Sequence, residues 1–304
     1  EMCIRDRSNA NMENEIRFPF LGIVFKHVGE GISIGGFEIK YYGMVIALGF
    51  LLGMLAAARM AKKNGVNPEL VFDFIIAVMI PAIIGARLYY VIFSWDYYKD
   101  HLTEILNTRS GGLAIYGGII ASVIVMVIFC RVKKIEFFKL ADIAVPGLLI
   151  GQILGRWGNF FNREAFGGFT NGPLAMQIPT DYFVKHGRLS EIVDAGLYDQ
   201  AVFVGSGSHM NTYIQVHPTF LYEGLWNLAL LIIIVIMSRH KKFDGQMLVI
   251  YAMGYGIGRF WIEGLRTDQL LIPGTQIAVS QVVAVLLAVG ALLVLLCKWR
   301  KRKQ

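Results

Sequence analysis

Seven long apolar segments constrain this chain more than any other feature of its sequence. A helix needs about 20 mostly apolar residues to cross the hydrocarbon core of a bilayer. The chain therefore predicts an all-α integral membrane protein with seven transmembrane helices. The fourth segment is the weakest, because it is short and contains Asp142, Pro146 and several glycines. The segments cover roughly 41–58, 70–93, 113–130, 140–157, 219–238, 246–264 and 276–297.

Composition and charge support the same class. Only 17% of the residues are charged and 55% are hydrophobic, whereas soluble domains average about 25% charged residues. The net charge of +7 does not indicate a nucleic-acid partner, because the cations fall in short clusters between apolar runs. Cys3, Cys130 and Cys297 are scattered without metal-ligand or disulfide spacing. No metal site and no nucleophilic cysteine are expected.

The basic clusters predict the orientation of the helices. Clusters follow the first, third, fifth and seventh segments, while the alternate loops 94–112 and 265–275 carry few cations. By the positive-inside rule the N-terminus lies outside and the C-terminus in the cytoplasm. The long polar loop 158–218 then forms a small extracytoplasmic cap. The cations of the clusters are Arg59, Lys62, Lys63, Arg131, Lys133, Lys134, Arg239, Lys241, Lys242, Lys298, Arg300, Lys301, Arg302 and Lys303.

Two short stretches resemble expression scars. The first ten residues, EMCIRDRSNA, match nothing that follows, and 11–304 is interpreted as a single transmembrane domain without a cleavable signal peptide. GSGSHM at 205–210 fits an engineered scar and a native flexible loop equally well.

Charged residues inside membrane segments are costly and are usually functional. With the orientation above, most of them lie near the outer ends of their helices, together with Tyr42, Tyr116 and His217. Two or three arginines at head-group depth predict an anion site, because the guanidinium fork matches phosphate oxygens. The charged residues in the segments are Asp73, Arg87, Asp142, Arg156, Glu223, Arg259 and Glu263.

Each candidate also has a structural interpretation that the sequence leaves open. Arg87 fits a snorkelling side chain as well as a paired one, and Asp142 fits a structural residue at a helix start. Arg259 and Glu263 are spaced i, i+4 and can neutralise one another. Helix-end, capping and aromatic-belt roles compete in the same way for Tyr42, Tyr116, His217 and the Arg156–Asn159 pair.

The stretch GRWGNFFNREAFGG, 155–168, adds a resemblance. It resembles the signature G-R-x-G-N-F-x-N-x-E-x-x-G of bacterial phosphatidylglycerol–prolipoprotein diacylglyceryl transferases. Similar blocks extend over almost the whole chain, and the family shares the predicted seven-helix, N-outside topology. These blocks are YYGM at 41–44, GARLYYV at 85–91, GGLAIYGG at 111–118, HPTFLYE at 217–223 and YGIGRFWIEGLR at 255–266.

The resemblance implies a reaction, its partners and its place. The family transfers the diacylglyceryl group of phosphatidylglycerol to the thiol of the lipobox cysteine in a prolipoprotein signal peptide. The products are a thioether and glycerol phosphate, and no cofactor or metal is implied. The enzyme is expected in the bacterial cytoplasmic (inner) membrane, among membrane lipids, with its active site facing the outer leaflet.

The resemblance also implies roles for residues. Arg156 and Arg259 correspond to a phosphate clamp, and Glu263 positions Arg259. The head-group and substrate contacts are assigned to Tyr42, Arg87, Asn159, Asn162, Glu164 and Gly167.

The general base is the one departure from the family pattern. The best-known members of the family have His where this chain has Tyr116, and tyrosine, with a pKa of about 10, is a poor base at neutral pH. Either His217 or Glu164 is the base, or Tyr116 only orients groups while the arginines lower the thiol pKa.

Three other classes compete with this interpretation. A transporter or flippase for an anion would place its site near the midplane between repeated halves, and no repeat is visible here. A seven-helix receptor or structural protein would not need the dense polar stretch at a helix end. Another phospholipid-using transferase is the nearest alternative.

Overall fold

The computed structural model describes residues 13–108, 111–205 and 210–300, with side chains up to 298. The scar expectations for 1–10 and for most of 205–210 lie outside these residues. The chain divides into two compact units. Unit 1 comprises Glu1–Phe50, Leu149–Ile236 and Val249–Gln304, and unit 2 comprises Leu51–Leu148 and Met237–Leu248.

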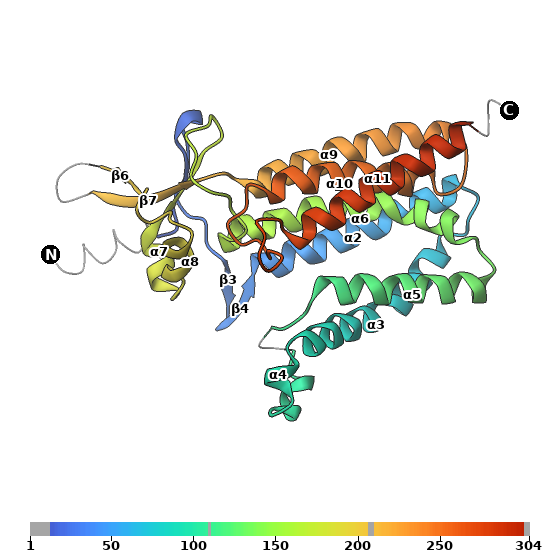
Figure 1. Ribbon diagram of the computed structural model, residues 1–304, viewed down its shortest axis with the longest axis horizontal. Helices are drawn as coiled ribbons and strands as arrows, with labels where there is room; N and C mark the ends of the chain where they lie inside the picture. Colours follow the sequence, from blue (N-terminus) through green and yellow to red (C-terminus); the bar gives the residue numbers. More distant parts are fainter. Residues whose placement is uncertain (1–12, 109–110, 206–209, 301–304) are drawn as a thin grey trace. The chain divides into compact units, whose positions relative to one another are not determined.

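All seven apolar segments form helices (Figure 1). Six are long and apolar enough to cross a membrane, which makes the chain a multi-pass membrane protein. The exception is α10, whose 18 residues include Gln246, Arg259, Glu263 and three glycines. The fourth segment, predicted to be the weakest, forms the longest of the seven, a helix of 26 residues. The helices are α2 (Tyr41–Lys63), α3 (Glu69–Phe93), α5 (Ile115–Lys133), α6 (Phe137–Asn162), α9 (Thr219–Met237), α10 (Gln246–Glu263) and α11 (Val279–Arg300).

The polar cap of unit 1 is built on a sheet, which an all-α interpretation does not include. Its five antiparallel strands have the order β2-β1-β5-β7-β6. Two of them come from before the first membrane helix, so the cap is larger than the predicted 158–218. A separate hairpin, β3–β4, leads directly into α2. The strands are β1 (Ile16–Phe18), β2 (Ile23–Phe25), β3 (Gly31–Ile34), β4 (Phe37–Lys40), β5 (Met176–Pro179), β6 (Val202–Val204) and β7 (Asn211–Val216).

An apolar core holds the cap together. Two short helices, α7 (Thr180–Lys185) and α8 (Leu189–Asp194), contribute Phe183 and Ile192, which pack in one buried cluster with strand residues such as Ile178. These three side chains are fully buried. The same cluster contains Ile16 and Phe18 of β1, so it ties the N-terminal strands to the long loop after α6.

Small residues bring the helices of unit 1 close together. A Cβ on Gly256 of α10 would lie 2.5 Å from the carbonyl oxygen of Ala284 in α11. On another side of α10, Gly258 makes room for Trp226, whose indole donates a 2.8 Å hydrogen bond to the carbonyl of Gly254. Such contacts replace the hydrophobic driving force that is missing between helices in lipid.

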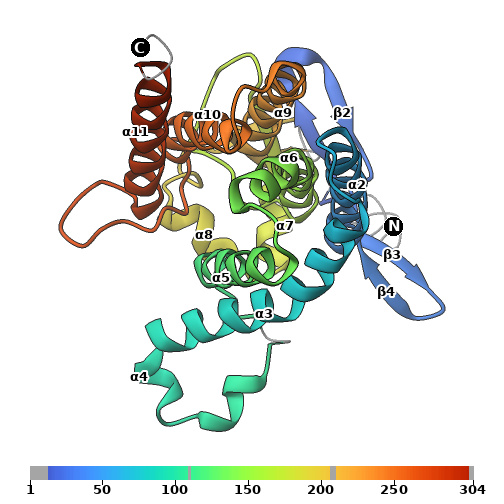
Figure 2. The ribbon, with the colours of Figure 1, turned by 90° about the vertical axis from the view of Figure 1, so that its right-hand side faces the viewer.

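In unit 2, α3 and α5 lie side by side in both views (Figures 1 and 2). Gly85 and Gly117 form the contact, and a Cβ on either would come within 2.7 Å of the other's carbonyl oxygen. Asp142 lies inside α6, is buried, and accepts hydrogen bonds of 2.8 and 2.9 Å from the amides of Gly245 and Leu248. It therefore caps the start of α10 rather than of its own helix. Its structural interpretation is supported, and Lys241 pairs with it at 2.9 Å.

Candidate functional site

Two arginines and two glutamates meet inside unit 1 and form what we call the arginine cluster: Arg156, Glu223, Arg259 and Glu263. Glu223 of α9 is its centre. One carboxylate oxygen lies 2.8 Å from Nη2 of Arg156 on α6, and the other lies 3.3 Å from Nη1 of Arg259 on α10. Arg259 also pairs with Glu263 at 2.5 Å, one turn along the same helix. The predicted i, i+4 pair is confirmed, and the structure joins it to Arg156.

The carboxylates of the arginine cluster are more deeply buried than its guanidinium groups. The side chains of Glu223 and Glu263 are 4% and 6% exposed, whereas those of Arg156 and Arg259 are 22% and 16% exposed. The buried carboxylates therefore hold the arginines in place from the interior, and the guanidinium groups form the accessible side of the cluster. Each guanidinium has five N–H donors, more than these contacts engage, so donors remain for an incoming anion. From the sequence, Glu223 was predicted only as an intramembrane charge without a role in the site.

The signature stretch extends the arginine cluster toward the cap. Arg156 donates to the side-chain oxygen of Asn159 at 3.2 Å, and the Asn159 amide donates to Glu164 at 2.8 Å. Asn162 approaches the same Glu164 oxygen at 3.5 Å. The chain turns sharply after α6 because Arg163 and Ala165 adopt the left-handed conformation, with φ of 48° and 54°. This turn brings Glu164 back over the last turn of α6.

Gly167 and Tyr42 are placed by close packing. The Gly167 amide donates a 2.9 Å hydrogen bond to the carbonyl of His217, and a Cβ there would lie 2.7 Å from the carbonyl oxygen of Leu265. Gly167 is thus required by backbone packing, and a substrate contact for it stays a prediction. The ring of Tyr42 lies against Gly158, where a Cβ would come within 2.5 Å of a ring carbon.

A cavity of about 360 Å³ lies next to Glu164. Three predicted residues, Tyr42, Asn162 and Glu164, share its lining with five residues that were not predicted from the sequence. Those five belong to no recognisable motif, because strand β4, helix α7 and the loops around them bring them together from distant parts of the chain. They are Glu30, Lys40, Tyr182, His186 and Arg188.

The polar lining of this cavity is held in a mixed-charge network. Glu30 accepts a hydrogen bond from Tyr182 and pairs with Lys40 at 3.0 Å and His186 at 3.2 Å. Burial alone would raise the pKa of Glu30, but the hydrogen bonds from Tyr182 and Lys40 and the nearby cations lower it overall. Burial and the Glu30 contact raise the pKa of Tyr182 to about 12. At neutral pH the lining of this cavity therefore presents the Glu30 carboxylate as an acceptor and the protonated Tyr182 hydroxyl as a donor.

His217 lies just before α9 and is half-buried. One of its ring nitrogens, Nδ1, lies 3.2 Å from the hydroxyl of Tyr222. Burial lowers the pKa of His217 below 6.5, so the imidazole is neutral at pH 7 and can accept a proton.

The two remaining candidates belong to unit 2. Arg87 is buried and donates hydrogen bonds of 2.7–3.0 Å to backbone carbonyls of the segment between α3 and α5. These bonds hold that segment in place and occupy most of the N–H donors of Arg87, so a substrate role for Arg87 stays a prediction. The carbonyls bound by Arg87 are those of Glu104, Ile105, Gly111 and Gly112.

Tyr116 has its ring centre 6.4 Å from that of Tyr89, and its hydroxyl makes no hydrogen bond to the residues described.

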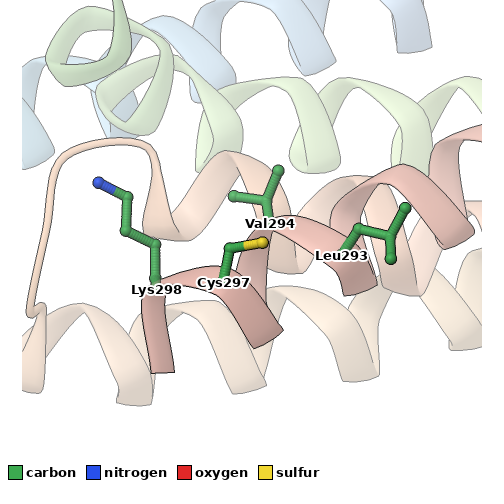
Figure 3. A pocket seen from close by; sticks show the side chains of 4 residues that line it. All are labelled: Leu293, Val294, Cys297 and Lys298. Carbon is green, nitrogen blue, oxygen red and sulfur yellow. The ribbon is translucent and has the colours of Figure 1, made fainter. Parts of the chain in front are cut away.

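Another hollow, of about 230 Å³, lies on α11 and is lined by Leu293, Val294, Cys297 and Lys298 (Figure 3). It offers one isolated thiol and one amine, without a carboxylate or a neighbouring base in its lining. These groups alone do not form a reaction site. Within the described part of the chain, no group of three or more His, Cys, Asp or Glu side chains could hold a metal ion.

Apolar helices that hold a polar cluster with buried carboxylates and accessible arginines define a multi-pass membrane protein with a polar site. Residues 30–297 match the family model described as "Prolipoprotein diacylglyceryl transferase". The chain therefore belongs to this family of transferases.

Individual relatives agree with the family match. A protein of Finegoldia magna is 40% identical over 89% of this chain and 95% of its own length. One of Thermosynechococcus vestitus is 36% identical, with 88% and 91% covered, and one of Listeria innocua is 40% identical, with 85% of each covered. All three are named phosphatidylglycerol–prolipoprotein diacylglyceryl transferase.

Proposed function

We propose that this protein transfers the diacylglyceryl group of phosphatidylglycerol to the lipobox cysteine thiol of prolipoproteins, a step of bacterial lipoprotein maturation. The thiol loses its proton, and the sulfur forms a bond to the glyceryl carbon that carries the phosphate. The bond from that carbon to the phosphate ester oxygen breaks, and its electron pair leaves with glycerol phosphate. The arginine cluster is the observation that carries this proposal, together with the family match.

The arginine cluster suits the charge change of this reaction. The phosphodiester bears one negative charge, and the departing glycerol phosphate gains a second as the bond breaks. Arg156 and Arg259 are held in place by buried carboxylates, so their donors need little reorganisation to meet that charge. Fixed donors aimed at developing charge stabilise the transition state more than the ground state.

The cavity beside Glu164 suits the glycerol head group. It is joined to Arg156 through Asn159 and Glu164, so a phosphate at the arginines would direct its glycerol toward the cavity. Glycerol hydroxyls both donate and accept hydrogen bonds, and the wall has carboxylates as acceptors and Lys40 and Arg188 as donors. A neutral polyol fits this mixed wall better than a second cation or anion would.

His217 is our choice for the general base. A neutral imidazole is available at pH 7, whereas Glu164 is already engaged by two amides and the Tyr116 hydroxyl makes no hydrogen bond to the described residues. We expect the transfer rate to fall as pH drops below 6.5 and protonates His217. His217→Gln should remove this acid limb and lower the rate roughly 10²-fold, while Tyr116→Phe retains activity. A Tyr116→Phe protein that folds but is inactive, beside an active His217→Gln, would assign the base role to the tyrosine.

We further propose that all seven helices cross the bacterial cytoplasmic membrane, with the cap and arginine cluster at the outer leaflet. The arrangement of basic clusters supports this orientation. In a variant without its native cysteines, Asp199→Cys in the cap should react with an impermeant maleimide on intact cells. Glu136→Cys, between α5 and α6, should react only after permeabilisation. The opposite labelling pattern would reverse the topology.

The direct test uses purified protein, phosphatidylglycerol and a synthetic lipobox peptide. The peptide should gain the mass of one diacylglyceryl group on its cysteine, with one glycerol phosphate released per product. A peptide whose lipobox cysteine is replaced by serine is the matched control. If folded protein moves phosphatidylglycerol between leaflets without modifying a competent peptide, it is a flippase and the proposal fails.

A further inference from the structure

The inner face of α9 changes from polar to apolar along its length. Its buried positions recur every three or four residues, as expected for the inward face of a packed helix. Asn227 is the last polar residue of this face, one turn beyond Glu223 and just before Leu230. The buried positions are Thr219, Phe220, Glu223, Asn227, Leu230 and Ile234.

Asn227 is fully buried, and its amide has no hydrogen bond. Neither its nitrogen nor its oxygen finds a partner among the residues that the structure describes. Burying an unpaired amide costs roughly 2–7 kcal/mol, and in a bilayer no bulk water can lower that cost. Within the described residues Asn227 is therefore a buried donor and acceptor that a bound polar group would satisfy.

A second orphaned amide lies at the same level. Gln152 is four residues before Arg156 on α6, and its nitrogen donates to the hydroxyl of Tyr251 at 2.8 Å. Its side-chain oxygen is buried without a partner among the described residues. Because α6 and α9 run in opposite directions (Figure 1) and Arg156 faces Glu223, Gln152 is one turn inward, as Asn227 is. We call Gln152, Asn227 and Tyr251 the amide layer.

We propose that the Asn227 amide donates a hydrogen bond to an ester carbonyl of the bound phospholipid and so selects diester-linked glycerophospholipids. This inference rests on the proposed function, which places the phosphate at the arginine cluster. From that phosphate toward the acyl chains, the next polar groups of the lipid are its two ester carbonyls. The amide layer is about 5.4 Å further along the helix axis, one turn, and beyond it the face of α9 becomes apolar.

The chemistry of the two groups matches. An ester carbonyl only accepts hydrogen bonds, and the Asn227 nitrogen is a donor without an acceptor. An ether-linked lipid with the same head group keeps the phosphate and the reacting carbon but lacks the carbonyl. Asn227 thus acts as a specificity-determining residue, distinct from the arginines that hold the phosphate.

The test compares diester and diether phosphatidylglycerol as donors, because both contain the bond that breaks. Wild-type protein should transfer from the diester lipid roughly tenfold faster, the effect of one well-placed hydrogen bond. Asn227→Leu should lower the rate with the diester lipid by that same factor and leave the rate with the diether lipid unchanged. Leu230→Ala, on the same face, is the control and should change both rates by the same factor. Thermal unfolding of each variant checks that it is folded.

Several results would overturn the proposal. One is a wild-type protein that uses both lipids equally, and this measurement needs no variant. Another is an Asn227→Leu protein whose loss is equal on both lipids, since a packing role or a buried water would produce that pattern. Absence of product from wild type with either lipid would instead mean that the proposed function itself fails.

Discussion

Arg156→Ala is expected to lower kcat for transfer from phosphatidylglycerol by about 10²–10³-fold, the usual effect of deleting one preorganised donor to developing charge. Arg156 belongs to the signature stretch, where it donates to Asn159, and it also pairs with Glu223 of the arginine cluster. Its loss removes a donor from the phosphate and disconnects the cluster from Glu164. Arg156→Lys keeps the charge without the planar fork, so its kcat should lie between those of wild type and Arg156→Ala.

The effect of Arg156 should appear mainly in kcat, because the second negative charge forms only as the bond breaks. Arg131→Ala, an exposed arginine near the end of α5, is the matched control and should retain full activity. Steady-state rates with a lipobox peptide, beside thermal unfolding of each variant, make the measurement. A folded Arg156→Ala enzyme whose kcat is unchanged would remove Arg156 from the phosphate site.

Glu223→Ala is expected to destabilise the folded protein by about 3–5 kcal/mol, the usual cost of removing one partner from a buried ion pair. Its carboxylate contacts both Arg156 and Arg259, so the substitution strands two cations at once. Unfolding temperature in detergent micelles measures the effect. Phosphatidylglycerol should restore part of the lost stability to the variant, since its phosphate can pair with the released guanidinium groups.

Asp73→Ala provides the matched control for Glu223. Asp73 also pairs with a cation across two helices, Lys133 at 2.7 Å, but both side chains are well exposed, at 48% and 39%. Such a pair contributes about 1 kcal/mol or less, and the lipid should not change the result. Equal losses from Asp73→Ala and Glu223→Ala, without dependence on phosphatidylglycerol, would show that Glu223 is not the support of an anion site.

Local contacts of the candidate site were predictable from spacing. Arg259 and Glu263 pair as i, i+4 neighbours, and Arg156 reaches Asn159 as its i+3 neighbour. Both are properties of one helix, so the sequence contains all the information that they require. The same holds for the helices themselves, because an apolar run of sufficient length must satisfy its backbone internally.

Contacts between elements were not predictable in this way. Asp142 was expected near its own helix start, yet it caps α10 from inside α6. Strands β1 and β2 join the cap although they precede every membrane helix. Spacing along the chain does not encode such pairings, because their geometry depends on how helices and strands approach one another.

The sequence by itself determined the class of protein, the positions of seven helices, the family and the arginines of the proposed site. Hydropathy and helical periodicity act over a few turns, and the signature stretch is continuous, so these features are local. Only the tertiary structure decided that Glu223 joins the two arginines, that Glu30 and Arg188 line a cavity beside Glu164, and that Asn227 is buried without a partner. Each depends on side chains from different helices or strands meeting in space, which packing alone establishes.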